Sequence, residues 1–324
     1  MKGKKLFCLI ISLQLLAIIF LILFLRQKIS PKITYSPLPK ESVLATQVGN
    51  LKSFFEPTPN TLAEDNPWMP YRAKNTINAD SLNERYDYSP EKISGVFRIV
   101  TLGDSWTYGL YVDTQDNWSE KLEDKLNSQK VCDKAGKYEV INLGVGGYDL
   151  QYAIERFKLR GAKYSPDIVL WLIKSDDYGQ VNELILPREQ EIGEEMRKTG
   201  EFEREVKAGI NYPSWFRAYA EFAQKYNEDD ILSLQREILA TFDKDYKNPI
   251  VFLTFPTVPE KGEALINWFM GARPNTYFYK DLVDVLADAS LQFPTDKHPN
   301  PKGHGRIAED LFKYLSEQKF LPCP

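Results

Sequence analysis

A serine at the end of a short apolar run is the first residue of this sequence that could do chemistry. The run IVTL at 99–102 is followed directly by Gly103, Asp104 and Ser105. Such residues predict a buried strand, with the serine at its carboxyl end. A serine attacks a carbonyl carbon only with a base in reach and with donors for the oxyanion. Ser105 is therefore a candidate nucleophile, and an ordinary turn serine is the alternative.

The search for a base is short because the chain has only two histidines. Both lie in the segment FPTDKHPNPKGHGRIAEDL, residues 293–311. His298 follows Asp296 by two residues in an expected loop, whereas His304 immediately precedes an expected helix and could simply brace that loop. A histidine with a carboxylate close by is a better candidate for a base than a lone histidine.

The elements that must position these residues alternate between strands and helices. Buried strands are expected at 96–103, 138–144, 166–173 and 249–255, and helices at 117–129, 150–164, 229–246 and 305–318. This alternation predicts an α/β domain with a mostly parallel sheet and helices on both faces. In such sheets ligands bind beyond the carboxyl ends of the strands, which is where Ser105, Gly147 and Asp176 are expected.

Four blocks in this order resemble the SGNH/GDSL hydrolase family. They are the Gly-Asp-Ser turn, INLGVGGY, PDIVLWLIKSDD and DKHPNPKGH, and together they span about 95–178 and 248–315. The resemblance implies a three-layer α/β/α sandwich with a flavodoxin-like sheet. The nucleophile elbow of α/β-hydrolases is a poorer match, because it needs glycine where this chain has Thr107.

The family resemblance also implies roles for individual residues. Ser105 would attack the carbonyl carbon, His298 would take and return its proton, and Asp296 would orient the imidazole. The backbone N–H groups of Ser105 and Gly147 would stabilise the oxyanion. A glycine at 147 would allow the backbone to approach the substrate closely.

Two positions depart from the family pattern. The family has an asparagine that donates to the oxyanion where this chain has Asp176, and a carboxylate there would repel negative charge. A protonated Asp176, a replacement donor such as Lys174 or Asn182, or weak activity would each be consistent with this difference. The family often spaces its last block Asp-x-x-His, whereas this chain has Thr295 three residues before His298 and Asp296 two before. This Asp-x-His spacing is similar to that of SGNH-like alginate O-acetyltransferases.

Other residues near the motifs have simpler interpretations. Asp104 is expected to cap the turn after the nucleophile rather than to take part in the reaction. Trp106, Tyr108 and Trp171 could line an acyl or sugar site, but core or rim packing is the favoured interpretation. No cofactor is expected, and a metal is not expected because no cysteine–histidine cluster has zinc spacing.

The N-terminus predicts a membrane anchor, residues 1–28. Leu6 to Leu25 is a stretch of twenty residues that is interrupted only by Ser12 and Gln14, which is long enough to cross a bilayer as a helix. A cleaved signal peptide usually has an apolar core of about 7–15 residues followed by small residues, which are missing here. Basic residues flank both ends almost equally, so their count leaves the orientation open. We expect the rest of the chain outside the cytoplasm.

The remainder divides by composition. Residues 29–93 are expected to form a proline-rich stalk and an ordered lead-in segment, and 94–324 to form the hydrolase-like domain. A charged and aromatic helical insertion is expected at about 179–230, either as a lid or as a surface feature. Cys132 and Cys323 could pair in an oxidising compartment or remain separate thiols.

These observations favour a membrane-anchored serine esterase that acts on a carboxylic ester, for example acetyl groups on an envelope or extracellular polysaccharide. A polysaccharide O-acetyltransferase with the same triad and a non-catalytic binding or scaffold protein are the alternatives. The net charge of −4 gives no reason to expect a nucleic-acid partner.

Overall fold

The computed structural model describes residues 35–39, 49–64, 71–129, 136–210, 212–256 and 259–322. The chain divides into Met1–Ser36 and Pro37–Pro324, and every element named below belongs to the second unit. The apolar segment Leu6–Leu25 and the cysteines Cys132 and Cys323 lie outside the described residues. Within the described ranges, no helix combines the length and the apolar character needed to cross a membrane.

A five-stranded parallel sheet forms the centre of the domain, with the strand order β4-β3-β5-β6-β7. The strands are β3 (Val96–Leu102), β4 (Lys137–Asn142), β5 (Ile168–Leu172), β6 (Ile250–Leu253) and β7 (Thr276–Tyr279). Numbered from the first strand of the sheet, this order is 2-1-3-4-5, the flavodoxin-like order. The predicted α/β fold with a parallel, flavodoxin-like sheet is confirmed.

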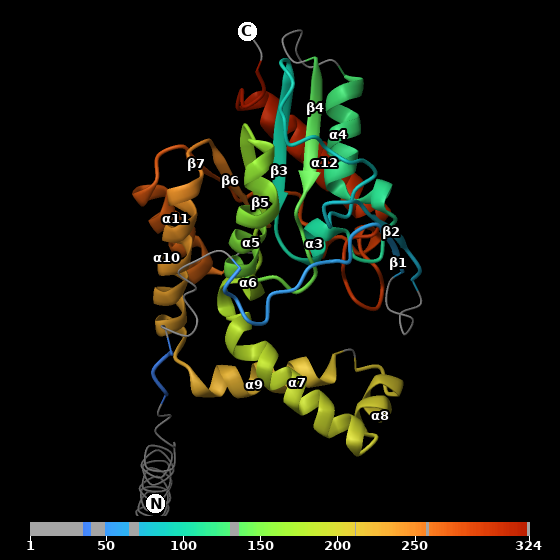
Figure 1. Ribbon diagram of the computed structural model, residues 1–324, viewed down its shortest axis with the longest axis vertical. Coiled ribbons are helices and arrows are strands. Elements are labelled where there is room, and N and C mark those ends of the chain that lie inside the picture. The colour runs from blue at the N-terminus through green and yellow to red at the C-terminus, as the bar shows by residue number, and fades with distance from the viewer. Residues whose placement is uncertain are drawn as a thin grey trace, which may run out of the picture. The chain divides into compact units, whose positions relative to one another are not determined.

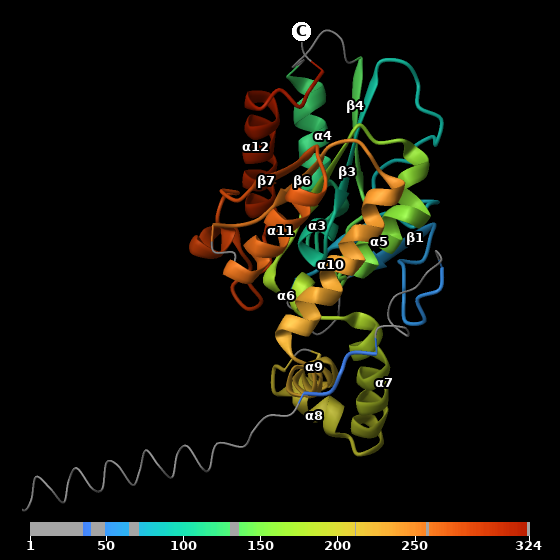
Figure 2. The ribbon, with the colours of Figure 1, turned by 90° about the vertical axis from the view of Figure 1, so that its left-hand side faces the viewer.

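Helices cover both faces of this sheet (Figures 1 and 2). On one face, α4 (Trp118–Ser128) and α12 (Pro301–Glu317) pack against Ile99, Val140 and Leu170. On the other, α5 (Leu150–Arg156), α10 (Glu228–Asp245) and α11 (Glu260–Ala272) pack against Val100 and Trp171. Because successive strand residues point to opposite faces, near-continuous apolar strands such as β5 bury both of their faces.

The carboxyl ends of the first three strands lead into the segments that carry the candidate site (Figure 1). Strand β3 runs into a one-turn helix, α3 (Ser105–Tyr108), and β5 into α6 (Ser175–Gly179). Strand β4 continues into the glycine-rich turn 144–147. Parallel neighbouring strands bring these three turns to one edge of the sheet, as predicted.

One strand of the central sheet, β7 (Thr276–Tyr279), and the helix before it, α11, were not expected from the sequence. Strand β7 has only four residues and follows Pro274 closely, and α11 lies between it and β6. Both belong to the far end of the sheet. They complete the regular alternation of strand and helix without changing the position of the candidate site.

The segment expected to be a stalk is partly folded onto the domain. Strands β1 (Thr61–Glu64) and β2 (Lys74–Ile77) pair antiparallel. Upstream of them, the backbone N–H groups of Lys52 and Ser53 donate to the Glu183 carboxylate at 3.0 and 2.8 Å. Leu51 is buried in a small cluster with Tyr148 and Tyr152. Residues 49–64 therefore contact the domain instead of forming a bare spacer.

The helical insertion forms three helices between α6 and α10. They are α7 (Asn182–Lys198), α8 (Glu201–Lys207) and α9 (Pro213–Lys225), and Figure 1 shows them beyond the carboxyl end of β5. The first residue of α7, Asn182, is fully buried and touches the turn that follows β4. This contact joins the insertion to the edge of the sheet that carries the candidate site.

Candidate active site

Two short hydrogen bonds join the three residues singled out from the sequence. Ser105 Oγ lies 2.8 Å from His298 Nε2, and His298 Nδ1 lies 2.6 Å from Asp296 Oδ1. With the Nδ1 proton directed to the carboxylate, Nε2 is free to accept the serine proton. Ser105 and His298 are 193 positions apart, so the fold and not local sequence creates this arrangement.

The turn after β3 fixes the position of the nucleophile. Ser105 is the first residue of α3, and Asp104 caps this helix by accepting from Trp106 N at 3.0 Å. Gly103 precedes them at a φ of +146°, and a Cβ there would lie 2.8 Å from the Leu172 carbonyl oxygen. A side chain at Gly103 would therefore push β3 and β5 apart. The expected capping role of Asp104 is confirmed.

The loop that carries the base is braced by its own residues. Asp296 Oδ1 accepts from both the backbone N–H and the ring of His298, at 3.1 and 2.6 Å. An aspartate naturally reaches the backbone N–H two residues later, so the Asp-x-His spacing holds the ring and the backbone at once. The N–H of Phe293 donates to the His298 carbonyl at 2.9 Å and closes the loop.

Electrostatics favour an ionised carboxylate beside the histidine. Burial by itself would raise the pKa of Asp296. The hydrogen bonds and the charge of His298, together with a hydrogen bond from Tyr111, lower this pKa more than burial raises it. The pKa of Asp296 therefore lies below its usual range. A carboxylate in this state would stabilise a protonated imidazole at His298.

Aromatic residues surround the histidine, and most of them were not expected from the sequence. The ring centroids of Trp106 and Tyr111 lie 6.0 and 5.7 Å from that of His298. The ring of Tyr71 packs at a tilt against that of Phe293, with centroids 4.1 Å apart, and its hydroxyl lies 2.8 Å from Thr295 Oγ1 in the same loop. Tyr71 comes from the lead-in segment, so no spacing in the sequence could connect it to His298.

Gly147 lies in the turn after β4, as expected, and its backbone conformation gives a further reason for glycine there. Its φ is +81°, a left-handed conformation that favours glycine, whereas a Cβ at this position would meet no atom within 4 Å. The neighbouring Gly146 faces Ser105, with a Cβ position 3.8 Å from the serine Cβ. The left-handed backbone conformation therefore favours glycine at 147, and the close approach of a substrate to this residue stays a prediction.

Asn182 supports the glycine turn and is not placed as a free donor. Its Nδ2 donates to the Gly147 carbonyl at 2.8 Å, and its backbone N–H donates to Asp149 Oδ2 at 2.7 Å. Asp149 also caps α5 by accepting from Tyr152 N. Asn182 is one of the two donors that the sequence suggested in place of the family's asparagine. Its hydrogen bonds stabilise the glycine turn instead.

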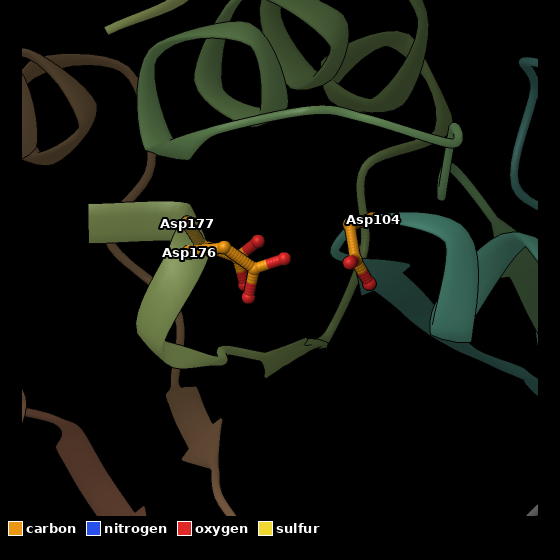
Figure 3. Close-up of side chains that lie close together, drawn as sticks. All are labelled: Asp104, Asp176 and Asp177. Atoms are coloured by element: carbon orange, nitrogen blue, oxygen red, sulfur yellow. The ribbon is translucent and has the colours of Figure 1, made fainter. Parts of the chain in front are cut away.

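Asp176 lies near the nucleophile, and its carboxylate is bound by Lys174. The Lys174 ammonium is 3.0 Å from each Asp176 oxygen and 2.6 Å from Asp104 Oδ2. The Asp176 side chain is 49 % exposed. Figure 3 shows Asp104 facing Asp176 and Asp177. Asp176 is therefore an ion-paired carboxylate and not a donor.

The remaining predicted residues are placed in the core or at its edge. Trp171 is buried against Phe242 and Phe252, so it is a core residue. Tyr108 is half-buried at the end of α3. His304 is fully buried and accepts from Trp118 N at 3.1 Å, and burial lowers its pKa to about 3. His304 thus links α12 to α4 and takes no part in the site.

The sheet order and the hydrogen-bonded serine, histidine and aspartate are those that the sequence blocks imply. The chain has the fold of the SGNH/GDSL hydrolases. No family model matches the sequence, and no curated protein matches it.

Solved structures that resemble this chain have low sequence identity to it. TesA is 14 % identical over 69 % of this chain and 99 % of its own, with a TM-score of 0.44. The psychrotrophic esterase EstA from Pseudoalteromonas is 15 % identical over 69 % and 97 %, with a TM-score of 0.43. A protein described as a lipolytic member of the G-D-S-L family, from Desulfitobacterium hafniense, is 15 % identical over 67 % and 99 %, with a TM-score of 0.39. We base the function on the side-chain geometry of this chain.

Proposed function

We propose that this protein is a serine hydrolase that cleaves carboxylic esters. The observation that carries the proposal is the continuous hydrogen-bonded series Ser105–His298–Asp296, with distances of 2.8 and 2.6 Å. A serine with a base in reach and an acid behind that base is the arrangement that makes a hydroxyl nucleophilic at neutral pH. A binding or scaffold protein would have no need of this series.

The reaction follows from the positions of the protons. His298 Nε2 takes the Ser105 proton as Oγ attacks the carbonyl carbon of the ester. The tetrahedral intermediate collapses, the bond to the alcohol oxygen breaks, and the imidazolium returns its proton to that oxygen. Water then repeats these steps on the acyl-serine, releases the carboxylic acid and restores Ser105. Asp296 keeps the imidazole in the productive tautomer throughout.

Backbone groups are the proposed stabilisers of the oxyanion. Ser105 is the first residue of α3, where helix N–H groups have no partner within the helix. The turn 146–147 lies beside Ser105, and Asn182 holds its Gly147 carbonyl. We assign the N–H groups of Ser105 and Gly147 to the oxyanion on this basis.

A small acyl group on a sugar is the substrate that we propose. Ser105 is only 9 % exposed and is bordered by Trp106 and Gly146, which suits an acetyl group better than a bulky one. Tyr71 and Phe293 are half-buried next to the catalytic loop. Aromatic faces in such positions suit the apolar face of a sugar ring, which supports acetylated polysaccharide as the substrate class.

The apolar segment Leu6–Leu25 supports a location at a membrane. We propose that it anchors the chain and that the hydrolase domain lies outside the cytoplasm. There, acetylated envelope or extracellular polysaccharide would be within reach. Transfer of the acetyl group to a sugar hydroxyl instead of water would use the same acyl-serine.

The test of this proposal is acetate release by the full-length protein. We expect hydrolysis of p-nitrophenyl acetate and slower hydrolysis of the octanoate, because the small exposed area of Ser105 restricts long acyl chains. Both rates are measured by p-nitrophenolate absorbance, with heat-denatured protein as the control. A rate equal to that control on both esters, and on acetylated xylan by acetate assay, would contradict the esterase proposal.

A further inference from the structure

Three aspartates form a cluster, and one of them, Asp104, directly precedes the proposed nucleophile. Oxygen atoms of Asp104, Asp176 and Asp177 lie within 4.8 Å of one another (Figure 3). Asp104 Oδ2 is also 3.3 Å from Ser105 Oγ. A reaction that develops negative charge on an oxyanion should be slowed by carboxylates so close to it. This arrangement therefore requires a compensating positive charge.

Lys174 supplies that charge from the end of β5. Its ammonium is 2.6 Å from Asp104 Oδ2 and 3.0 Å from both Asp176 oxygens, and its side chain is 15 % exposed. The ammonium also lies 5.6 Å from the centre of the Trp106 ring. Its backbone N–H donates to Asp177 Oδ2 at 2.7 Å. Lys174 is thus held by all three aspartates and by the residue next to the nucleophile.

Lys174 stays protonated in this position. Burial would lower the pKa of Lys174, but the charge of Asp104, followed by those of Asp176 and Asp177, outweighs burial and raises it. Asp177 behaves differently, because burial together with the charges of Asp104 and Asp176 raises the pKa of its carboxyl. The ammonium is therefore a permanent cation between two carboxylates.

The shared atom, Asp104 Oδ2, connects Lys174 to the chemistry. The single Ser105 proton has two acceptors within reach, His298 Nε2 at 2.8 Å and Asp104 Oδ2 at 3.3 Å. An ammonium 2.6 Å from Asp104 Oδ2 offers this oxygen a stronger partner than the hydroxyl. The serine proton is then left to the histidine.

We propose that Lys174 is a positioning residue of the active site. It keeps Asp104 from accepting the serine proton, and it neutralises the carboxylates that face the developing oxyanion. This inference rests on the proposed function and adds a residue to that site. The same ammonium supplies the cation of the aspartate cluster, so the cluster needs no metal ion.

The test is a set of variants at Lys174 and Asp176, assayed with p-nitrophenyl acetate. For Lys174→Met, we expect kcat to fall about 100-fold with KM changed less than threefold, because the lost interaction acts on the transition state. Lys174→Arg keeps the charge and should recover at least a tenth of kcat. A purely structural role of the lysine side chain would instead lower kcat in both variants equally, because both replace it.

Asp176→Asn gives an independent check at a half-exposed position that tolerates substitution. Removing this negative charge should raise kcat about threefold or more. In the Asp176→Asn background, Lys174→Met should cost at least fivefold less than in the wild type, because less charge then needs compensation. This result is informative even if Lys174→Met alone lowers the melting temperature.

The matched control is Lys163→Met, which removes an ion pair of the same length, 2.6 Å to Asp80, away from the site. We expect its kcat to be unchanged. Equal losses in Lys174→Met and Lys163→Met, or additive effects of Lys174→Met and Asp176→Asn, would overturn the role of Lys174. The role of Lys174 would also be overturned if millimolar Mg²⁺ fully restored the activity of Lys174→Met and also activated the wild type. Such a result would indicate a metal site. Because all these results are read against an active wild type, they are distinct from failure of the esterase proposal.

Discussion

Ser105→Ala is expected to reduce ester hydrolysis to the background rate. The substitution removes the proposed nucleophile, Ser105 Oγ, which lies 2.8 Å from His298 Nε2. Loss of a triad nucleophile costs about 10⁴- to 10⁶-fold in kcat, and residual catalysis comes from binding and from the oxyanion donors. The measurement is kcat for p-nitrophenyl acetate with the full-length protein and a zero-protein blank.

The control for this variant is another buried serine. Ser119 is fully buried on α4, and its hydroxyl lies 3.0 Å from Thr101 Oγ1. Ser119→Ala should keep kcat within twofold, although it loses a buried hydrogen bond and about 1 kcal/mol of stability. Activity of Ser105→Ala above a tenth of the wild-type value would contradict a serine nucleophile.

Asp296→Asn is expected to have the second largest effect, a fall in kcat of about 10³- to 10⁴-fold with KM nearly unchanged. The carboxylate accepts the Nδ1 proton of His298 at 2.6 Å. An amide can instead donate to Nδ1, which would place the ring proton on Nε2, facing Ser105. The histidine could then no longer accept the serine proton, although the position of its ring would be nearly unchanged.

Asp310→Asn is the matched control for Asp296→Asn. Asp310 Oδ2 accepts from Tyr279 Oη at 3.0 Å and from Val283 N at 2.9 Å, on the side of α12 next to β7. Its substitution should lower the melting temperature and leave kcat within threefold. If Asp296→Asn retained more than a tenth of kcat while Asp310→Asn behaved as expected, the role of Asp296 would have to be abandoned.

The proximity of Ser105, His298 and Asp296 could be predicted because each lies in a motif with a local signal. Ser105 follows an apolar strand, and His298 and Asp296 are two residues apart in a loop. The alternation of strands and helices then places both motifs at the same edge of a parallel sheet. The order of the four sequence blocks along the chain supports this prediction more strongly than the Gly-Asp-Ser triplet alone does.

Strand β7 and the folded part of the stalk segment were missed because their apolar residues do not recur at a clear strand or helix spacing. Strand β7 has the sequence TYFY and is only partly buried, so it gives a weaker apolar signal than the fully buried strands β5 and β6. The segment 49–64 looks like a spacer because it is polar and rich in proline. Its place on the domain depends on Glu183 accepting from Lys52 and Ser53, more than 100 positions away.

The electrostatics of the site were the least predictable part. Asp176 could be recognised from the sequence as an unfavourable residue near an oxyanion, and Lys174 as one possible replacement donor. Only the structure shows that the Lys174 ammonium pairs with Asp104, a residue from another turn, at 2.6 Å. Asn182 was an equally reasonable donor until its amide was seen on the Gly147 carbonyl. Such pairings depend on rotamers and not on spacing.

The most direct test of the central claim is covalent labelling with a fluorophosphonate, followed by mass spectrometry of the tryptic peptides. An activated serine attacks phosphorus and expels fluoride, whereas ordinary serines do not react. We predict one adduct, on the peptide that contains Ser105, and its loss in His298→Ala. An unlabelled Ser105 in a protein that hydrolyses p-nitrophenyl acetate, or a label that persists in His298→Ala, would contradict a histidine-activated Ser105 nucleophile.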